Sequence, residues 1–249
     1  MIKVLDKTFA ILEAIVLNSP RPMRISVLAE RFGINNGTCA RIIRELADEG
    51  YVIQVSRQEG YAAGPRALTL ANAVCYKPAL VDAARPLLEE TARRFSASVL
   101  LAERQGGLRY ILLHRNESPR LAIRLTELAF RDLFSTATGL MLAAFAPEEE
   151  LESLIAGAAG NDTSLIDSER GIRVQLAEIR RKGQAVFLDP ARRQGIAAFP
   201  VFRNGTFIAT LGGSIPADEY EERGAVFVEG LSQAASELGR SVSVIHTTG

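Results

Sequence analysis

Two short helical segments joined by a very short turn lie in the first fifty residues, and this spacing constrains the fold more than any other feature of the chain. Residues 27–32 and 36–49 both repeat apolar side chains at helical spacing. Only Gly33, Ile34 and Asn35 lie between them, a length that lets the second segment cross the first. The sequence therefore predicts a helix-turn-helix whose central Ile34 fills the gap between the helices.

A helix before this pair and a hairpin after it extend the motif. Residues 5–17 carry an apolar stripe at helical spacing, and prolines follow directly. Residues 51–55 and 60–62 are typical of two short strands around the polar tip at 56–59. We therefore predict a winged helix-turn-helix over residues 1–64.

Polar residues and glycines mark the ends of the two paired helices. Ser26 is expected to cap the first helix, and Asn35 or Asn36 the second, because short polar side chains accept hydrogen bonds from the first backbone N–H groups. Gly33 and Gly50 are expected to end them, since glycine tolerates a left-handed backbone.

Charge is balanced over the whole chain but not over this motif. Lys plus Arg number 29 and Asp plus Glu also number 29, so no global field attracts nucleic acid. Residues 21–44, however, hold five arginines and one glutamate, a local patch that suits phosphate contacts. The alternative is that these arginines only solvate a helical face. The candidate DNA contacts are Arg24, Ser26, Asn35, Asn36, Thr38, Arg41, Arg44, Arg57 and Gln58.

The rest of the chain mixes strands and helices, so we predict an α+β protein with a linker helix at 65–78 and a second domain at 79–249. Asn204-Gly205 between two apolar runs is the clearest hairpin signal. The expected strands are 98–103, 108–114, 121–125, 184–188, 195–202 and 206–214, and the expected helices are 81–95, 138–146, 148–156, 173–182 and 219–242.

Several of these segments together resemble the IclR-type transcriptional regulators over nearly the whole chain. The matching stretches are residues 25–30, Gly33-Ile34, Thr38, 41–43, Leu46, 50–52, Gly60-Tyr61, Gly64, 84–90, 136–139, 200–202 and 214–216. The resemblance implies a winged helix-turn-helix followed by a GAF-like α/β effector-binding domain. It also implies a ligand-responsive repressor or activator, usually of a catabolic operon, whose partners are a double-stranded DNA operator and a small organic acid or aromatic effector. Such proteins form homodimers or homotetramers.

The family's pocket, carried over position by position, departs from its usual polarity. Phe134 and Leu140 stand where the family usually has His and Lys, and Phe187 and Ile196 replace an Asp and a Cys or Ser. We expect an effector larger and less polar than a small oxoacid, held against an apolar wall. The alternative is that the rings fill the pocket and no ligand binds. The expected effector contacts are Phe134, Ala137, Thr138, Phe187, Ile196, Gly212 and Ser214.

Other reactive residues point to no further chemistry. Cys39 and Cys75 cannot form a disulfide framework, so a reducing cytoplasmic location and packing roles are expected. His114 and His246 are too few for a metal site, and the acidic run at 148–150 suits the first turn of a helix. We expect no catalytic residue, cofactor, metal, targeting segment or membrane span.

Two other functions stay open from the sequence. The chain could be an enzyme for a small metabolite whose helical head serves only assembly, or a constitutive DNA-binding protein whose sensor pocket has lost its ligand. Salt dependence separates the first of these from a regulator, because DNA binding weakens steeply with salt.

Overall fold

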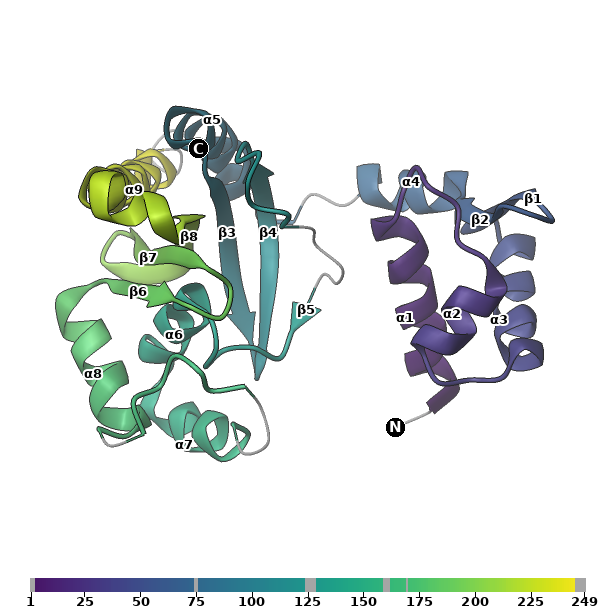
Figure 1. The fold of residues 1–249 in the computed structure, drawn as a ribbon, viewed down its shortest axis with the longest axis horizontal. Helices are drawn as coiled ribbons and strands as arrows, with labels where there is room; N and C mark the ends of the chain where they lie inside the picture. Colours follow the sequence, from purple (N-terminus) through teal and green to yellow (C-terminus); the bar gives the residue numbers. More distant parts are fainter. Residues whose placement is uncertain (1–2, 74–75, 124–128, 159–161, 169, 245–249) are drawn as a thin grey trace. The chain divides into compact units, whose positions relative to one another are not determined.

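The computed structural model describes residues 3–73, 76–123, 129–158, 162–168 and 170–244. The described residues form two compact units, one that extends to Tyr76 and one that begins at Lys77 (Figure 1). Each unit has its own hydrophobic core. The predicted linker of residues 65–78 contains one helix and the first residue of the next.

The first unit is a winged helix-turn-helix, which confirms the predicted fold class. Its core includes fully buried Ile11, Ile15, Leu28, Ile43 and Val52, with Ile34 half-buried against the core. Its elements are α1 (Lys3–Leu17), α2 (Ile25–Arg31), α3 (Asn36–Asp48), β1 (Val52–Ser56), β2 (Gly60–Ala63) and α4 (Pro65–Ala73).

The starts of α2 and α3 differ in how they are capped. Asn35 caps α3, and its Oδ1 accepts a hydrogen bond from the backbone N of Thr38 at 2.7 Å. The prediction that Ser26 caps α2 was wrong, because Arg24 occupies the N-cap position, without a side-chain cap, and Ser26 lies in the first turn. Met23 forms a β-bridge with Tyr61, which leaves Arg24 extended and starts the helix at Ile25.

The second unit is built on a six-stranded antiparallel sheet with the strand order β5-β4-β3-β8-β7-β6. The strands are β3 (Ser98–Gln105), β4 (Leu108–Asn116), β5 (Ala129–Phe130), β6 (Ala185–Asp189), β7 (Gln194–Arg203) and β8 (Thr206–Pro216). The helices are α5 (Pro78–Phe95), α6 (Ala137–Ala144), α7 (Glu148–Ala156), α8 (Ile172–Lys182) and α9 (Tyr220–Val244), the last preceded by a 3-10 turn at Ala217–Glu219.

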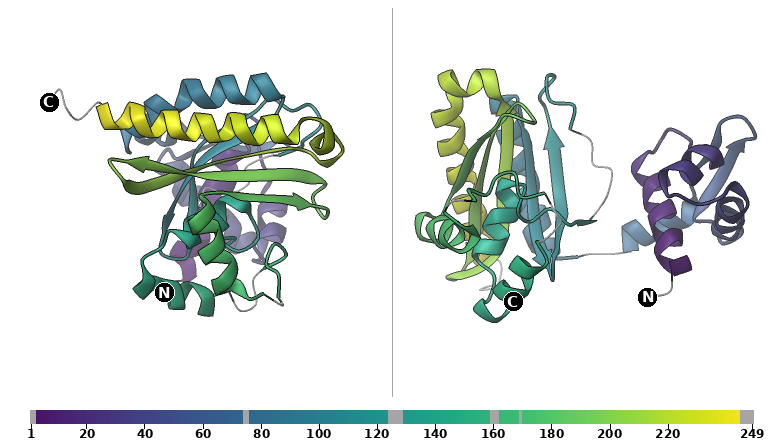
Figure 2. Two further views of the ribbon diagram at one scale, coloured as in Figure 1. Left: turned by 90° about the vertical axis from the view of Figure 1, so that its left-hand side faces the viewer. Right: turned by 60° about the horizontal axis from the view of Figure 1, so that its bottom comes forward.

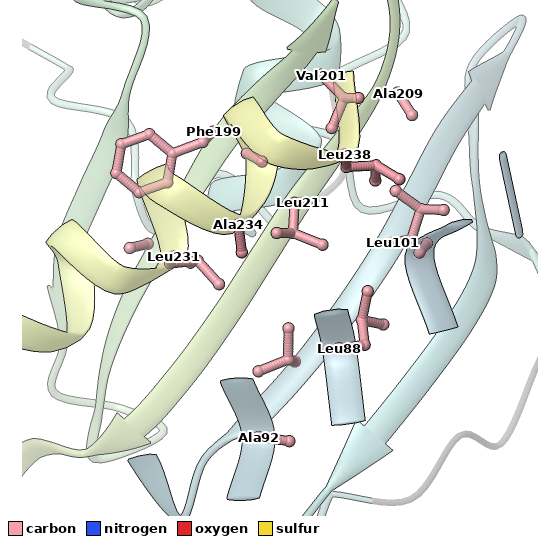
Figure 3. Close-up of a cluster of buried hydrophobic side chains, with 14 of the residues drawn as sticks. Leu88, Ala92, Leu101, Phe199, Val201, Ala209, Leu211, Leu231, Ala234 and Leu238 are labelled. Atoms are coloured by element: carbon pink, nitrogen blue, oxygen red, sulfur yellow. The ribbon is translucent and has the colours of Figure 1, made fainter. Parts of the chain in front are cut away.

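Helices cover both faces of this sheet. α5 and α9 lie side by side over one face (Figure 2), where Leu101, Leu211, Phe227 and Leu231 are fully buried. Figure 3 shows Leu211, Leu231 and their neighbours directed toward one another between α9 and the strands. α6 and α8 pack on the other face, where Met141 is a fully buried member of a second hydrophobic cluster. The sheet thus separates two hydrophobic layers.

The hairpin of β7 and β8 confirms the strongest turn signal in the sequence. Asn204 and Gly205 have positive φ angles of 50° and 79°. A two-residue hairpin turn of type I′ requires a positive φ at both of its central residues. The strand expected at 121–125 was wrong. Residues 121–123 carry no strand, residues 124 and 125 lie outside the described ones, and β5 lies at Ala129–Phe130 against β4.

The helix expected to begin at Val81 begins three residues earlier, at Pro78. Proline is tolerated at this first position because its missing N–H has no partner within a helix anyway. Pro86 lies inside α5, and the helix continues through it to Phe95. Among the described residues, no helix is both long and apolar enough to cross a bilayer.

Candidate functional site

The polar side of α3 is accessible in the first unit. Asn35, Asn36, Arg41 and Arg44 are exposed, and Thr38 is half-buried. The opposite side of the helix carries the buried residues Cys39, Ile42, Ile43 and Leu46. The burial of one side therefore fixes the helix with its Asn and Arg side chains directed outward, as base reading in a major groove requires.

The cations on α3 are available to an anionic partner. Neither Arg41 nor Arg44 forms an ion pair with any residue that the structure describes. Arginine can form two hydrogen bonds with guanine, and its charge can also neutralise a phosphate. Asparagine can form two hydrogen bonds with adenine. This side of the helix therefore offers both kinds of DNA contact.

The wing is fastened to the start of α2. Arg57 and Gln58 are exposed at the hairpin tip, and Arg24 donates from Nε to the carbonyl oxygen of Gln58 at 2.7 Å. Met23 and Tyr61 exchange two backbone hydrogen bonds at 2.8 and 2.9 Å. Arg24 is exposed and holds the tip in place, and Ser26 is exposed beside it.

A cavity of about 120 Å³ lies in the second unit between the sheet and the start of α6. Four of the expected effector contacts line it, namely Ala137, Thr138, Ile196 and Ser214. It is comparable in volume to an engineered cavity of about 150 Å³ that takes benzene. The space therefore suits a ligand of about one aromatic ring.

The structure does not bring the expected aromatic wall to this cavity. Phe134 is 4% exposed and packs in the cluster beneath α6, and Phe187 lines a different depression beside Gln175. Gly212 lies under Thr138, since a Cβ at Gly212 would come within 2.1 Å of Thr138 Cγ2. Its contribution is the close approach of α6 to the sheet.

Polar residues that the sequence did not single out complete the lining. Ser98 and Ser214 are register partners on β3 and β8, so both hydroxyls lie on the cavity face of the sheet. Ser98 Oγ lies 2.9 Å from Nε2 of His114, within hydrogen-bond distance. Burial and the neighbouring Arg115 lower the pKa of His114, which keeps its imidazole neutral near neutral pH. The other lining residues outside the expected contacts are Leu100, Arg109, Ile123, Ser135, Thr136, Asp189, Arg192, Gln194, Ala197 and Gly213, of which Thr136 belongs to the stretch 136–139 that resembles the family.

Two arginines of the lining are held by carboxylates. Arg109 is 5% exposed and donates from Nε to Asp132 Oδ1 at 2.8 Å, with a second bond from Nη2. Arg192 donates from Nη1 to Asp189 Oδ2 at 2.6 Å and from Nη2 to Asp162 Oδ2 at 3.2 Å. Burial alone would raise the pKa of Asp189, but hydrogen bonds from Arg192 outweigh it and lower that pKa. The pair of Arg192 and Asp189 is therefore ionised.

The first turn of α6 adds backbone donors to the cavity. Thr136 caps the helix and accepts a hydrogen bond from the N of Gly139 at 3.0 Å. The backbone N–H groups of Ala137 and Thr138 have no acceptor among the described residues, and both residues line the cavity. They are therefore free to donate to an oxygen of a ligand.

The remaining reactive residues take structural positions. Cys39 is buried in the core of the first unit, and burial raises the pKa of its thiol. Glu148–Glu150 form the first turn of α7 as expected, and Glu148 pairs with Arg173. No cluster of potential metal ligands occurs among the described residues. Cys75 and His246 lie outside the described residues.

Family models match both parts of the chain. Residues 4–56 match the IclR helix-turn-helix domain. Residues 73–240 match the C-terminal domain of the bacterial transcriptional regulator IclR. These two matches correspond in order to the two units of the structure.

Individual proteins are similar over most of the chain. The HTH-type transcriptional regulator TtgV of Pseudomonas putida is 23% identical over 243 residues, which cover 97% of this chain and 92% of TtgV. The Thermotoga maritima IclR structure has a TM-score of 0.70 at 23% identity and covers 98% of this chain and 100% of its own. An IclR homologue from Microbacterium hydrocarbonoxydans, complexed with 4-hydroxybenzoate, has a TM-score of 0.75 at 20% identity and covers 97% and 99%.

Proposed function

Because the chain belongs to the IclR family of bacterial transcriptional regulators, we propose that its first unit binds operator DNA through α3 and that its second unit binds a small organic effector in the cavity. The observation that carries the DNA part is that Arg41 and Arg44 are exposed opposite the packed face of the helix and pair with no carboxylate in the described part of the chain. The family favours a regulator over the alternative of an enzyme with an assembly head. Such a regulator acts where the DNA is, in the cytoplasm.

Arg41→Ala is expected to weaken specific DNA binding by ~1–3 kcal/mol, because Arg41 is placed to bond a guanine edge. Fluorescence anisotropy with duplexes selected from a random pool by the full chain measures the loss. Arg93→Ala, which removes an exposed arginine of α5, is the matched control and should leave the affinity unchanged. Equal affinities for the Arg41 variant and the unaltered protein would exclude Arg41 from base reading.

Salt dependence tests the DNA assignment as a whole. Affinity for the selected duplex should fall steeply as salt rises, since each neutralised phosphate releases counterions. A protein whose head serves only assembly would bind no duplex at any salt concentration.

The first unit also supports assembly into a dimer. Val4, Leu5 and Phe9 on α1 and Leu68 and Leu70 on α4 are large apolar side chains with 48–64% of their surface exposed within the chain. Apolar surface of this kind is suited to burial against a second copy. A dimer would present two copies of α3 to two half-sites of an operator. Both a homodimer and a homotetramer agree with this surface.

Effector binding is expected for at least one ring-sized organic compound, and Ser214→Ala should weaken it by about 1 kcal/mol, roughly fivefold, through a lost hydrogen bond. Calorimetric titration of the full chain with single-ring aromatic compounds and small organic acids measures the affinity of the unaltered protein and of the Ser214 variant. Ser236→Ala, on the exposed side of α9, is the control.

A compound that binds should also change the affinity for DNA, because an effector acts by binding two states of the protein unequally. No heat with any compound would favour a pocket filled by its own side chains, and so a constitutive DNA binder.

A further inference from the structure

We propose that Arg109 is a specificity-determining residue of the cavity, which binds a carboxylate of the ligand through Nη1 of its guanidinium group. This inference rests on the proposed effector function and adds the residue that recognises a charged end of the effector. Arg109 lies on β4, a strand on which the sequence predicted no effector contact.

One edge of the Arg109 guanidinium is already occupied. Its Nε donates to Asp132 Oδ1 at 2.8 Å, and its Nη2 donates to Asp132 Oδ2, so one carboxylate takes up this edge. The ring of Phe130 also lies against the group, with its centroid 5.0 Å from Cζ. These contacts hold the guanidinium in a fixed orientation. Nη1, on the other edge, forms no hydrogen bond with any residue in the described part of the chain.

The burial of Arg109 gives this unused donor its significance. Arg109 is 5% exposed and lines the cavity, and buried polar groups in folded proteins are normally hydrogen-bonded. A bound molecule is therefore the expected source of an acceptor for Nη1. An anionic oxygen is the strongest acceptor for a guanidinium N–H, and the hydrogen bond gains strength away from water.

The backbone of Asp132 connects Arg109 with the start of α6. The carbonyl oxygen of Asp132 accepts hydrogen bonds from the N of Ser135 at 3.2 Å and from Oγ1 of Thr136 at 3.3 Å. Thr136 is the N-cap of α6, and the two free N–H groups of the first turn follow it directly. The guanidinium and the first turn of α6 are thus neighbours at the cavity, and both offer donors to a carboxylate.

Arg192, the other arginine of the lining, is less suited to this role. Its Nη1 donates to Asp189 and to the carbonyl oxygen of Ser135, and its Nη2 donates to Asp162. Its side chain is also 43% exposed, so water screens its charge more effectively. We therefore assign the recognition of the carboxylate to Arg109.

The first test uses ligand pairs that differ in charge at one group: benzoate with benzamide, and propionate with propionamide. Calorimetric titration of the full chain near neutral pH should show that the carboxylate of at least one pair binds roughly tenfold more tightly than its amide, the effect of one hydrogen bond to a charged group. If neither carboxylate bound more tightly than its amide, the inference would be overturned and the effector site would stand. If none of the four compounds bound, the effector site would be overturned with it.

A paired substitution removes the guanidinium without leaving its aspartate unpaired. Arg109→Met with Asp132→Asn replaces a buried ion pair by uncharged side chains, a change that folded proteins often tolerate. It should lower the affinity for the carboxylate roughly tenfold and leave the affinity for the amide unchanged. Arg173→Met with Glu148→Gln, an exposed pair outside the cavity lining, is the control and should change neither affinity. An equal loss for both ligands, or no loss, would contradict the assignment of Arg109.

Asp132→Asn alone is expected to act in the opposite direction. Arg109 then keeps one oxygen partner at Asn but loses the charge that compensates its own, so the affinity for the carboxylate should rise severalfold while the affinity for the amide stays the same. Circular dichroism checks that both variants are folded. Any result other than a selective gain for the carboxylate would contradict the proposed contact.

Discussion

Phe227→Ala should lower the free energy of unfolding of the second unit by about 3–5 kcal/mol, the range for a large aromatic side chain removed from a packed core. Phe227 is fully buried on α9, and its ring meets that of Phe95 edge to face at 5.7 Å. It also lies against Gly213 of β8, where no side chain could fill the space it leaves. Denaturant unfolding followed by circular dichroism measures the loss.

Val226→Ala is the matched control for this substitution. Val226 precedes Phe227 on the same helix but is 54% exposed, so its truncation should change the stability by less than about 0.5 kcal/mol. The first unit has a separate core, and it should therefore unfold at an unchanged denaturant concentration in both variants. If the Phe227 and Val226 variants were equally stable, the packing of α5 and α9 on the sheet would not be a main source of the stability of the second unit.

Gly60→Ala is expected to destabilise the first unit by roughly 2–4 kcal/mol and to weaken DNA binding with it. Gly60 has a φ of 102°, and a Cβ there would lie 2.2 Å from the carbonyl oxygen of Met23. Relief of that clash must separate the two backbones that Met23 and Tyr61 join, and so move the wing tip. Thermal unfolding of the first unit and anisotropy with the selected duplex measure the two effects.

Gly33→Ala separates backbone strain from the clash. Gly33 also has a positive φ, 60°, but a Cβ there meets no atom within 4 Å. Its replacement should therefore cost only about 1–2 kcal/mol of conformational strain. If both alanine variants lost the same stability, the close contact of Gly60 with the start of α2 would have no energetic importance.

Local signals explain why the first unit was predictable. The turn at residues 33–35 and the tip at 56–59 each connect segments that are neighbours in sequence, so spacing alone determines which elements meet. The same holds for the Asn204-Gly205 hairpin. The prediction of Ser26 as a cap fails because the β-bridge between Met23 and Tyr61 determines where α2 begins. These two residues are far apart in the sequence, so no local pattern indicates the bridge.

Sequence patterns do not predict the charged residues at the cavity. Arg109 comes from β4, Asp189 from the end of β6, and Asp132 and Asp162 from segments outside any strand or helix. Only the order of strands in the sheet brings them together, and no local pattern encodes that order. Phe134 and Phe187 were expected at the ligand because they replace polar family residues, yet their apolar rings pack with other apolar side chains.

Arg192 joins backbone segments that are far apart in the sequence. Its guanidinium ties the turn after β6 to the carbonyl oxygen of Ser135, 57 positions away, and to the loop at Asp162. One side chain thus holds three backbone segments together beside the cavity. Replacement of Arg192 would release all three segments while the sheet and both helical layers stay intact, so the outline of the cavity can change without a change of fold.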